Sequence, residues 1–446
     1  PGPFLTKHLS NNKALQLFHL MRQGSTILVA VFLAKSVLTT EEIGVFELLL
    51  YLGYTFSFFW VSGLIQGMLT LFPSKSESEK RLFYTNTYLL FLALSILIFL
   101  VMWFGENWVL TFFTGQSSLA YYRLFLVYFL INIPTYLLEH YYLLNNKPLK
   151  IVGFGLFSFA GYFLVVLIPV FLGWGLLWSF YGLIALAIIK HVWLLLYLFG
   201  RGHLNLNTEF LKEWLVISLP LIMYAFIAGF NQSFGAWLVN FHYEGNEAIF
   251  AIFRYGAREL PLAMAMANAF NVVMLPEVVK NTEEAIAMIR QKSVKLLHLL
   301  FPISVILMLS SHWWFPIVFN PEFYSSALIF NVFLLVLITR LIFPQTILIG
   351  LKANKTILLI SVLEFSFNII ISFILVHYLG ILGVALGTVF AYLLEKILLC
   401  FFLMKRYRIA PGQYINLKWF IPYTLLLLLS FIASLQWHQS FFQTLN

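Results

Sequence analysis

Thirteen long apolar runs constrain the fold of this chain more than any other feature of its sequence. A helix that crosses a bilayer needs about 20 mostly apolar residues, and lipid leaves no partner for backbone polar groups outside a helix or a closed barrel. In chain order the runs are 14–37, 42–71, 82–104, 119–144, 151–172, 176–199, 214–240, 247–275, 294–318, 325–350, 356–378, 381–404 and 419–437. We therefore expect an all-α polytopic membrane protein with thirteen spans, numbered here in that order.

The composition agrees with this expectation and removes several classes of function. Of the 446 residues 61% are hydrophobic and only 10% are charged, whereas about a quarter of the residues of a soluble protein are charged. All 18 acidic residues are Glu, which excludes aspartyl-phosphate pumps and Asp-dependent Mg²⁺ sites. The single Cys400 allows neither an internal disulfide nor a cysteine metal site. Without a Walker motif we expect no ATP hydrolysis, and we expect no cofactor, no metal and no enzyme.

The basic residues predict the orientation in the membrane. With the N-terminus in the cytoplasm, nineteen of the 27 Lys and Arg residues fall in cytoplasmic segments, and the opposite loops carry mainly Glu. The net charge of +9 therefore reflects topology and indicates anionic lipid headgroups rather than nucleic acid as the partner. The nineteen are Lys7, Lys13, Lys75, Lys80, Arg81, Lys147, Lys150, Arg201, Lys212, Lys280, Arg290, Lys292, Lys295, Lys352, Lys355, Lys405, Arg406, Arg408 and Lys418.

A weak internal repeat divides the chain into two halves. Short matches recur in order at offsets of 203 to 208 residues, for example Glu42–Phe46 with Asn246–Phe250, and Asn146-Lys147 with Asn354-Lys355. An offset of six spans gives two halves of the same orientation, as in transporters whose substrate site lies between parallel repeats. The sequence thus predicts two six-helix bundles around a central cavity, with one extra C-terminal span.

The repeat also predicts the boundaries of these parts. We expect an N-terminal bundle over 4–200, a cytoplasmic linker over 201–213 and a C-terminal bundle over 214–408. Residues 409–446 would form an amphipathic linker and the thirteenth span. The first three residues resemble the remnant of an expression tag and carry no part of this reasoning.

Ionisable residues deep in a span cost about 3 kcal/mol or more on insertion scales, so each one needs a reason. Arg22 lies nine residues beyond Lys13, which places it about 14 Å along its helix. Arg254 and Arg258 are four residues apart and share a helix face. Surplus positive charge in a water-filled cavity suits an anionic substrate. We therefore predict a substrate-binding set with two amides and one further arginine, namely Arg22, Arg254, Arg258, Asn231, Asn268 and Arg340.

Buried acids are candidates for binding a coupling cation or proton. Glu47 in span two and Glu364 with Asn368 in span eleven form this set, although each Glu could instead pair with an arginine. Asn132 and Glu139 share a face of span four. Lys190, Glu395 and Lys396 lie close enough to helix ends to extend to the membrane surface, so we predict no role for them.

Three segments resemble the multidrug/oligosaccharidyl-lipid/polysaccharide (MOP) flippase superfamily. They are Leu-Thr-Thr-Glu-Glu-Ile-Gly-Val-Phe at 38–46, Phe-Arg-Tyr-Gly-Ala-Arg-Glu-Leu-Pro at 253–261 and Tyr-Leu-Gly-Ile-Leu-Gly-Val-Ala at 378–385. The chain looks most like bacterial oligosaccharide-lipid flippases. The resemblance implies alternating access of two six-helix bundles, with Arg22, Arg254 and Arg258 at the positions of cavity arginines that hold a pyrophosphate.

The resulting hypothesis is a flippase of the bacterial inner membrane that moves a polyprenyl-pyrophosphate-linked oligosaccharide to the outer leaflet. We expect it to be a monomer, to contact membrane lipids and to use a cation, a proton or the membrane potential. Three alternatives stay open at this point: a lipid II flippase, a multidrug exporter, and a membrane-embedded polysaccharide polymerase or glycosyltransferase. The last would need a large outer loop, and the outer segments are short.

Overall fold

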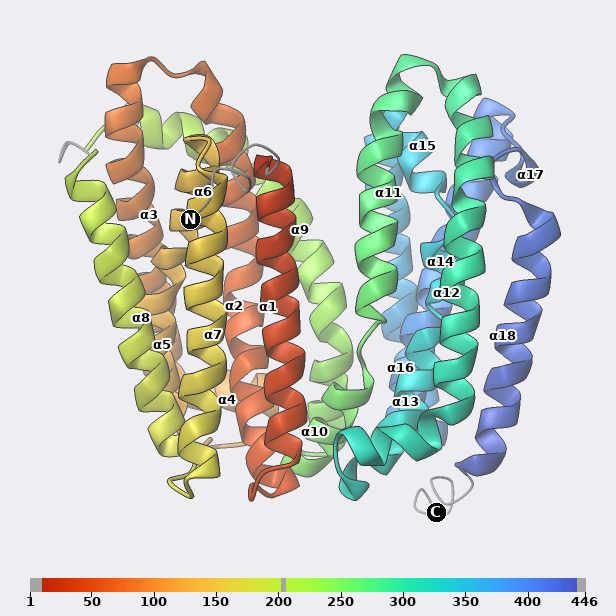
Figure 1. Cartoon of the computed structure of the whole chain (residues 1–446), viewed down its shortest axis with the longest axis horizontal. Helices are drawn as coiled ribbons and strands as arrows, with labels where there is room; N and C mark the ends of the chain where they lie inside the picture. The colour runs from red at the N-terminus through yellow and green to blue at the C-terminus, as the bar shows by residue number, and fades with distance from the viewer. Residues whose placement is uncertain (1–9, 202–205, 439–446) are drawn as a thin grey trace, which may run out of the picture. The chain divides into compact units, whose positions relative to one another are not determined.

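The computed structural model describes residues 10–201 and 206–438, and every regular element in these ranges is a helix (Figure 1). The α-helices and 3-10 turns (η) are α1 (Asn11–Ala34), α2 (Thr40–Leu71), η1 (Phe72–Ser74), α3 (Glu77–Phe104), α4 (Glu106–Thr114), α5 (Tyr122–Asn132), η2 (Ile133–Tyr136), α6 (Leu137–Leu144), α7 (Pro148–Phe171), α8 (Leu176–Phe199), α9 (Thr208–His242), α10 (Glu247–Gly256), α11 (Pro261–Lys280), α12 (Thr282–Val318), η3 (Pro321–Phe323), α13 (Tyr324–Leu334), α14 (Leu337–Arg340), α15 (Pro344–Gly350), α16 (Asn354–Tyr407), α17 (Pro411–Tyr414) and α18 (Leu417–Trp437).

The predicted apolar runs all form helices. Eleven helices in the described ranges are long and apolar enough to cross a membrane. The number is smaller than thirteen because α16 holds spans eleven and twelve and because span four is divided into α5, η2 and α6. Gly380 has φ 56° and ψ −138° and separates the two spans inside α16, a conformation that only glycine adopts at low cost. The chain is a multi-pass membrane protein.

Three predicted spans are broken rather than continuous, and each break lies beside a proline. Span four is interrupted by η2 with Pro134, span eight by residues 257–260 before Pro261, and span ten by residues 341–343 before Pro344. Proline removes a backbone donor. The residues before Pro261 and Pro344 also leave helical geometry, whereas Ile133 before Pro134 keeps it, with φ −59° and ψ −46°. The predicted spans over 119–144, 247–275 and 325–350 therefore each contain more than one helix.

Residues 38–46 owe part of their pattern to helix initiation. The Thr39 side chain accepts a hydrogen bond from the Glu42 backbone N–H, and the Glu42 carboxylate accepts one from the Thr39 N–H, so the two residues form a capping box. Ser76 and Glu79 repeat this arrangement at the start of α3. A helix start of this kind satisfies backbone donors that have no partner inside the helix.

Contacts divide the chain into two compact units. The first unit comprises Pro1–Ser233 and Glu244–Ala248, and the second comprises Phe234–Tyr243 and Ile249–Asn446. In the first unit α7 packs between α1 and α8, and α8 also packs against α5 (Figure 1). In the second unit α12 packs against α11, α13 and α18, and α16 packs against α13 and α15. The linker and bundle boundaries expected at 201–213 stay a prediction.

The first part of α9 packs tightly against α2 through glycines. A Cβ added to Gly63 would lie 2.6 Å from the backbone nitrogen of Ile222, and one added to Gly67 would meet the Ser218 side chain. The Trp214 indole donates a 3.0 Å hydrogen bond to the Leu64 carbonyl. Gly63 and Gly67 are four residues apart on one helix face, the spacing that lets membrane helices approach closely.

Span twelve uses the same device against span eleven. Cβ atoms added to Gly383 and Gly387 would meet the Leu375 backbone and the Ser372 side chain. Gly383 and Gly387 therefore form a packing face against span eleven.

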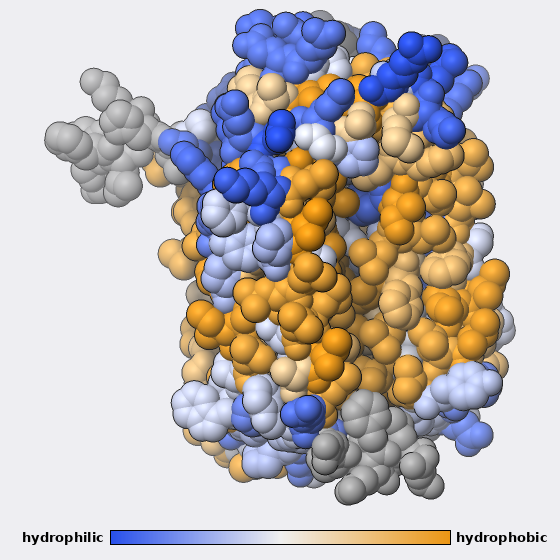
Figure 2. Space-filling view, turned by 90° about the vertical axis from the view of Figure 1, so that its right-hand side faces the viewer, coloured by the Kyte–Doolittle hydropathy of each residue, from blue (hydrophilic) through white to orange (hydrophobic). Residues whose placement is uncertain are grey.

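The surface of the helices is apolar along their middle sections. Figure 2 shows hydrophobic residues covering the middle of the displayed face and hydrophilic residues gathered at its two ends. Large apolar side chains such as Ile306 on α12 and Leu429 on α18 are more than half exposed. A surface of this kind is stable against lipid acyl chains and costly in water.

Candidate functional site

The break in span eight presents two of the predicted substrate-binding arginines. α10 ends at Gly256, Leu260 is extended with φ −62° and ψ 112°, and Pro261 opens α11. Arg254 lies in the last turn of α10, and Arg258 lies in the break itself. Both are partly buried. Because the break interrupts the helix inside an apolar segment, it places peptide groups and basic side chains together at one level of the span.

Arg258 is held against its own segment. Its Nε donates a 3.3 Å hydrogen bond to the Arg254 carbonyl, and its guanidinium lies 5.1 Å from the centre of the Tyr255 ring. Contact with an aromatic face stabilises a guanidinium. These contacts orient Arg258 relative to Arg254 before any substrate binds.

Arg340 forms an ion pair with an acid of the neighbouring break. Its Nε and one terminal nitrogen donate hydrogen bonds of 2.8 and 2.6 Å to the two Glu259 oxygens. The guanidinium also lies 5.0 Å from the centre of the Tyr392 ring. Glu259 lies in the break of span eight, and Arg340 precedes the break of span ten. The ion pair therefore connects two broken spans, which sequence reasoning did not predict.

The remaining predicted residues of the second unit divide into an exposed and a buried group. Asn268 is exposed on α11. Glu364 and Asn368 are buried on α16, with exposed fractions of 4% and 0%, and Ser372 donates a 2.9 Å hydrogen bond to the Asn368 side-chain oxygen. Tyr392 lies beside the Arg340 guanidinium, and Glu259 and Glu364 are close enough to act on it electrostatically.

In the first unit Arg22 is exposed on α1, one turn before Thr26, whose hydroxyl donates a 3.0 Å hydrogen bond to the Arg22 carbonyl. Glu47 is buried on α2, and Asn231 is partly buried on α9. Whether these residues bind substrate or a coupling ion stays a prediction.

The predictions for Lys190 and Lys396 are corrected by the structure. Both lysines are buried, with exposed fractions of 8% and 7%, and do not extend to a helix end. Lys190 donates a 2.7 Å hydrogen bond from Nζ to the Asn132 side-chain oxygen. Lys396 Nζ lies 3.4 Å from Glu395. The distance of these lysines from a helix end did not predict their exposure, because a polar partner inside each unit binds the ammonium group.

The buried polar cluster of the first unit is built around span four. Asn132 ends α5, Glu139 lies in the first turn of α6, and Lys190 comes from α8. Glu139 is 5% exposed, and the charges of Lys190 and Arg22 both reach its carboxylate. Sequence reasoning grouped Asn132 with Glu139 but missed Lys190, which is hydrogen-bonded to Asn132.

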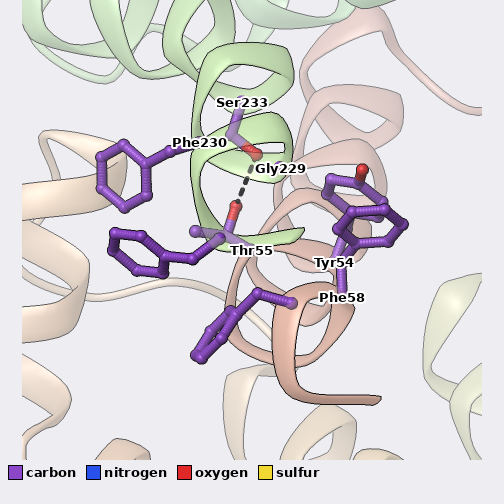
Figure 3. Close-up of a pocket in the computed structure, with 8 residues that line it drawn as sticks. Tyr54, Thr55, Phe58, Gly229, Phe230 and Ser233 are labelled. Carbon is purple, nitrogen blue, oxygen red and sulfur yellow. Dashed lines mark hydrogen bonds between the residues drawn. The ribbon is translucent and has the colours of Figure 1, made fainter. Parts of the chain in front are cut away.

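A small pocket between α2 and α9 of the first unit is a packing defect rather than a substrate site. Figure 3 shows the Thr55 hydroxyl pointing toward Ser233, with a hydrogen bond of 3.3 Å between the two hydroxyls, while the stacked rings of Tyr54 and Phe58 lie on one side of Gly229 and Phe230 lies on the other. Its volume of about 10 Å³ holds no more than about one water molecule. Tyr54 also donates a hydrogen bond to Gln232.

No protein-family model matches the chain, and no curated protein does. Solved structures do. The lipid II flippase MurJ in an inward closed conformation has a TM-score of 0.68 and 17% identity over 96% of this chain and 99% of its own. The chain has the fold of the MOP superfamily.

Other MOP structures support this assignment of the fold. An inward-facing multidrug resistance MATE family transporter of the superfamily has a TM-score of 0.68 and 15% identity over 88% of this chain and 94% of its own. A MOP transporter from Pyrococcus furiosus, described as having reversed polarity in its binding pocket, has a TM-score of 0.57 and 14% identity, covering 90% and 96%. The MOP resemblance predicted from the sequence is confirmed at the level of the fold.

Proposed function

We propose that the chain is a flippase that moves a polyprenyl-pyrophosphate-linked oligosaccharide from the inner to the outer leaflet by alternating access. The observation that carries the proposal is the pair of arginines at the break of span eight, on a fold that the lipid II flippase MurJ shares over nearly its full length. Broken membrane helices are typical of transporter binding sites. An anionic headgroup is the substrate that a basic break of this kind suits.

The proposed chemistry of binding follows from the side chains. Guanidinium groups bind phosphate oxygens in pairs with fixed geometry, so Arg254 and Arg258 would hold the pyrophosphate. Arg22 of the first unit would add a third positive charge. Asn231 and Asn268 would form hydrogen bonds with sugar hydroxyls. Arg340 would contribute chiefly by positioning, because Glu259 already balances its charge.

Energy for transport would come from a coupling ion or from the membrane potential acting on the anionic substrate. Glu47, Glu364 and Asn368 are the proposed coupling residues, since all three are buried and two carry a carboxylate. Following the distribution of basic residues, we further propose a cytoplasmic N-terminus and a location in the bacterial inner membrane.

Lipid II is the second candidate substrate, favoured by the likeness to MurJ. Lipid II and an oligosaccharide lipid share the polyprenyl chain and the pyrophosphate, and they differ in the groups attached beyond it. The proposed arginine contacts therefore serve both substrates. Only a direct comparison of the two lipids in one assay distinguishes them.

The test is a flipping assay in proteoliposomes with fluorescent polyprenyl-pyrophosphate glycolipid and, in parallel, fluorescent lipid II. We expect the double variant Arg254→Ala, Arg258→Ala to reduce the rate at least about tenfold, because two charge-assisted contacts are lost. A matched control, Lys405→Ala with Arg406→Ala, removes the same charge at the exposed end of α16. Undiminished flipping by the Arg254, Arg258 variant would contradict the assignment of these arginines to pyrophosphate binding.

A further inference from the structure

The carboxylate of Glu139 is buried without a donor for one of its oxygens. The residue is 5% exposed, and its Oε2 atom has no hydrogen-bond partner among the described residues. A charged carboxylate left without donors in an apolar interior costs several kcal/mol. A protonated carboxyl costs far less in the same place, and its O–H is itself a donor.

The basic groups around Glu139 have hydrogen bonds elsewhere. Lys190 Nζ donates to the Asn132 side chain at 2.7 Å and forms no ion pair with Glu139 within the described part of the chain. His140 Nδ1 lies 3.9 Å from Glu139 Oε1 but 2.8 Å from the Tyr136 carbonyl, to which it is hydrogen-bonded. Neither of these two basic side chains forms a hydrogen bond with Glu139 Oε2.

Other titratable groups complete the surroundings. On α8, His191 is hydrogen-bonded through both ring nitrogens, to Tyr88 of α3 and to the Ile131 carbonyl. On α1, His19 and Arg22 lie near His140, and Tyr136 of η2 lies near Arg22 and Glu139. The helices α2 and α7 also pack against α6, with Glu47 on α2 and Tyr162 on α7. Lys190 and Arg22 are the charged side chains that interact electrostatically with the Glu139 carboxyl group.

We propose that Glu139 is a buried proton-binding site of the first unit, and that Lys190 moves from Asn132 to the Glu139 carboxylate when the proton leaves. In the arrangement described above the carboxyl is protonated and Lys190 is bonded to Asn132. Arg22 is exposed within a span, and its charge requires water there. On deprotonation of Glu139 the proton passes to this water. The ammonium then balances the new carboxylate. No other bond forms or breaks.

The position of the three residues gives this exchange a mechanical consequence. Asn132 lies just before η2 and Glu139 just after it, so the break in span four separates the two partners of Lys190. When the Lys190 ammonium group moves, its partner changes from Asn132 on α5 to Glu139 on α6. Proton binding would therefore change the angle between α5 and α6. This role rests on the proposed transport function and supplies a coupling proton for it, whereas the proton site itself does not depend on the substrate.

The site is tested first without transport, by infrared difference spectroscopy of the purified chain in lipid nanodiscs across a pH titration. We expect a carboxylic-acid band that titrates in the unmodified chain and is lost in Glu139→Gln. Glu364→Gln, which removes another buried carboxyl, is the matched control and should leave that band in place. A band that persists unchanged in Glu139→Gln, or the lack of any titrating band in the folded chain, would overturn the site.

A second variant tests the proton site independently of whether Glu139→Gln folds. Lys190→Met keeps the length of the side chain and removes the ammonium group. We expect the Glu139 band to persist at pH values where it has disappeared from the unmodified chain, because the carboxylate has lost its counter-charge. An identical titration in Lys190→Met would contradict the proposed exchange.

The coupling role is tested by flipping in proteoliposomes with and without a pH gradient. We expect the gradient to change the rate severalfold in the unmodified chain and to have no effect in Glu139→Gln. A titrating band combined with a rate indifferent to the gradient overturns the coupling role. Complete lack of flipping by the unmodified chain contradicts the proposed function, and the spectra then decide the proton site by themselves.

Discussion

Arg340 and Glu259 form a two-pronged ion pair between the break of span ten and the break of span eight. Both hydrogen bonds are short, at 2.6 and 2.8 Å, and the side chains are 31% and 15% exposed. The pair joins segments that are 81 residues apart. The two hydrogen bonds of this ion pair fix the position of one break relative to the other.

Removing one partner of this pair should destabilise the second unit more than removing both. Arg340→Ala leaves the Glu259 carboxylate without its counter-charge and should cost roughly 2–3 kcal/mol, less than for a fully buried pair because the arginine is partly exposed. The double variant Arg340→Ala, Glu259→Ala should recover part of that loss. Thermal unfolding in detergent measures both effects, and additive losses would contradict the assigned coupling.

The close approach of α2 and α9 predicts a strong effect of one methyl group. Gly63→Ala would place a Cβ 2.6 Å from the Ile222 backbone nitrogen, so the helices must separate, at a cost of about 1–3 kcal/mol. Gly153→Ala on α7 is the matched control, since nothing lies within 4 Å of the added carbon. That control should be neutral or stabilising by about 0.5–1 kcal/mol. Melting temperatures in detergent provide the comparison, and equal values for both variants would refute the packing argument.

His438 predicts a pH-dependent loss of stability at the end of α18. Its burial and the neighbouring His312 lower the pKa of His438 from 6.5 to about 4. As the pH falls from 6.5 to about 4, the unfolded chain binds a proton that the folded chain excludes, so stability decreases over this window. His438→Gln should reduce the decrease by roughly 1–3 kcal/mol. A matching pH dependence of unfolding in both proteins would argue against a buried neutral histidine.

The proposed orientation predicts opposite accessibility for two exposed serines. Cys400 is the only cysteine, so Cys400→Ser gives a cysteine-free background. In that background Ser78→Cys, before span three, should react with a membrane-impermeant maleimide only after the cells are opened. Ser118→Cys, before span four, should react in intact cells. The reverse pattern would place the N-terminus outside.

The helical segments were predictable because lipid imposes one requirement along the whole chain. Any run of about 20 apolar residues must form a helix there, and this requirement is visible in sequence alone. The breaks were not predicted, although Pro134, Pro261 and Pro344 marked all three. Proline at the first turn of a helix and proline inside a span look alike in sequence, and tertiary contacts decide between them.

The candidate site was predictable only in part, for a different physical reason. Local spacing grouped Arg254 with Arg258 and Asn132 with Glu139 on the assumption of one continuous helix. That assumption is wrong for both pairs, because Arg258 lies beyond the end of α10 and η2 separates Asn132 from Glu139. The partners Lys190 for Asn132 and Glu259 for Arg340 come from segments 58 and 81 residues away. No periodicity within a span reports such pairings, so a buried lysine was mistaken for a surface one.

Gly380, which divides α16, determines how span twelve is rotated about its own axis. Because only Gly380 interrupts helical geometry, span twelve begins at a fixed rotation relative to span eleven. Inserting one residue after Gly380 would turn every later side chain by about 100°. Gly383 and Gly387 would leave their contacts with Leu375 and Ser372, and buried Lys396 would turn toward lipid. The conformation of Gly380 thus determines which side chains of span twelve face the protein and which face lipid.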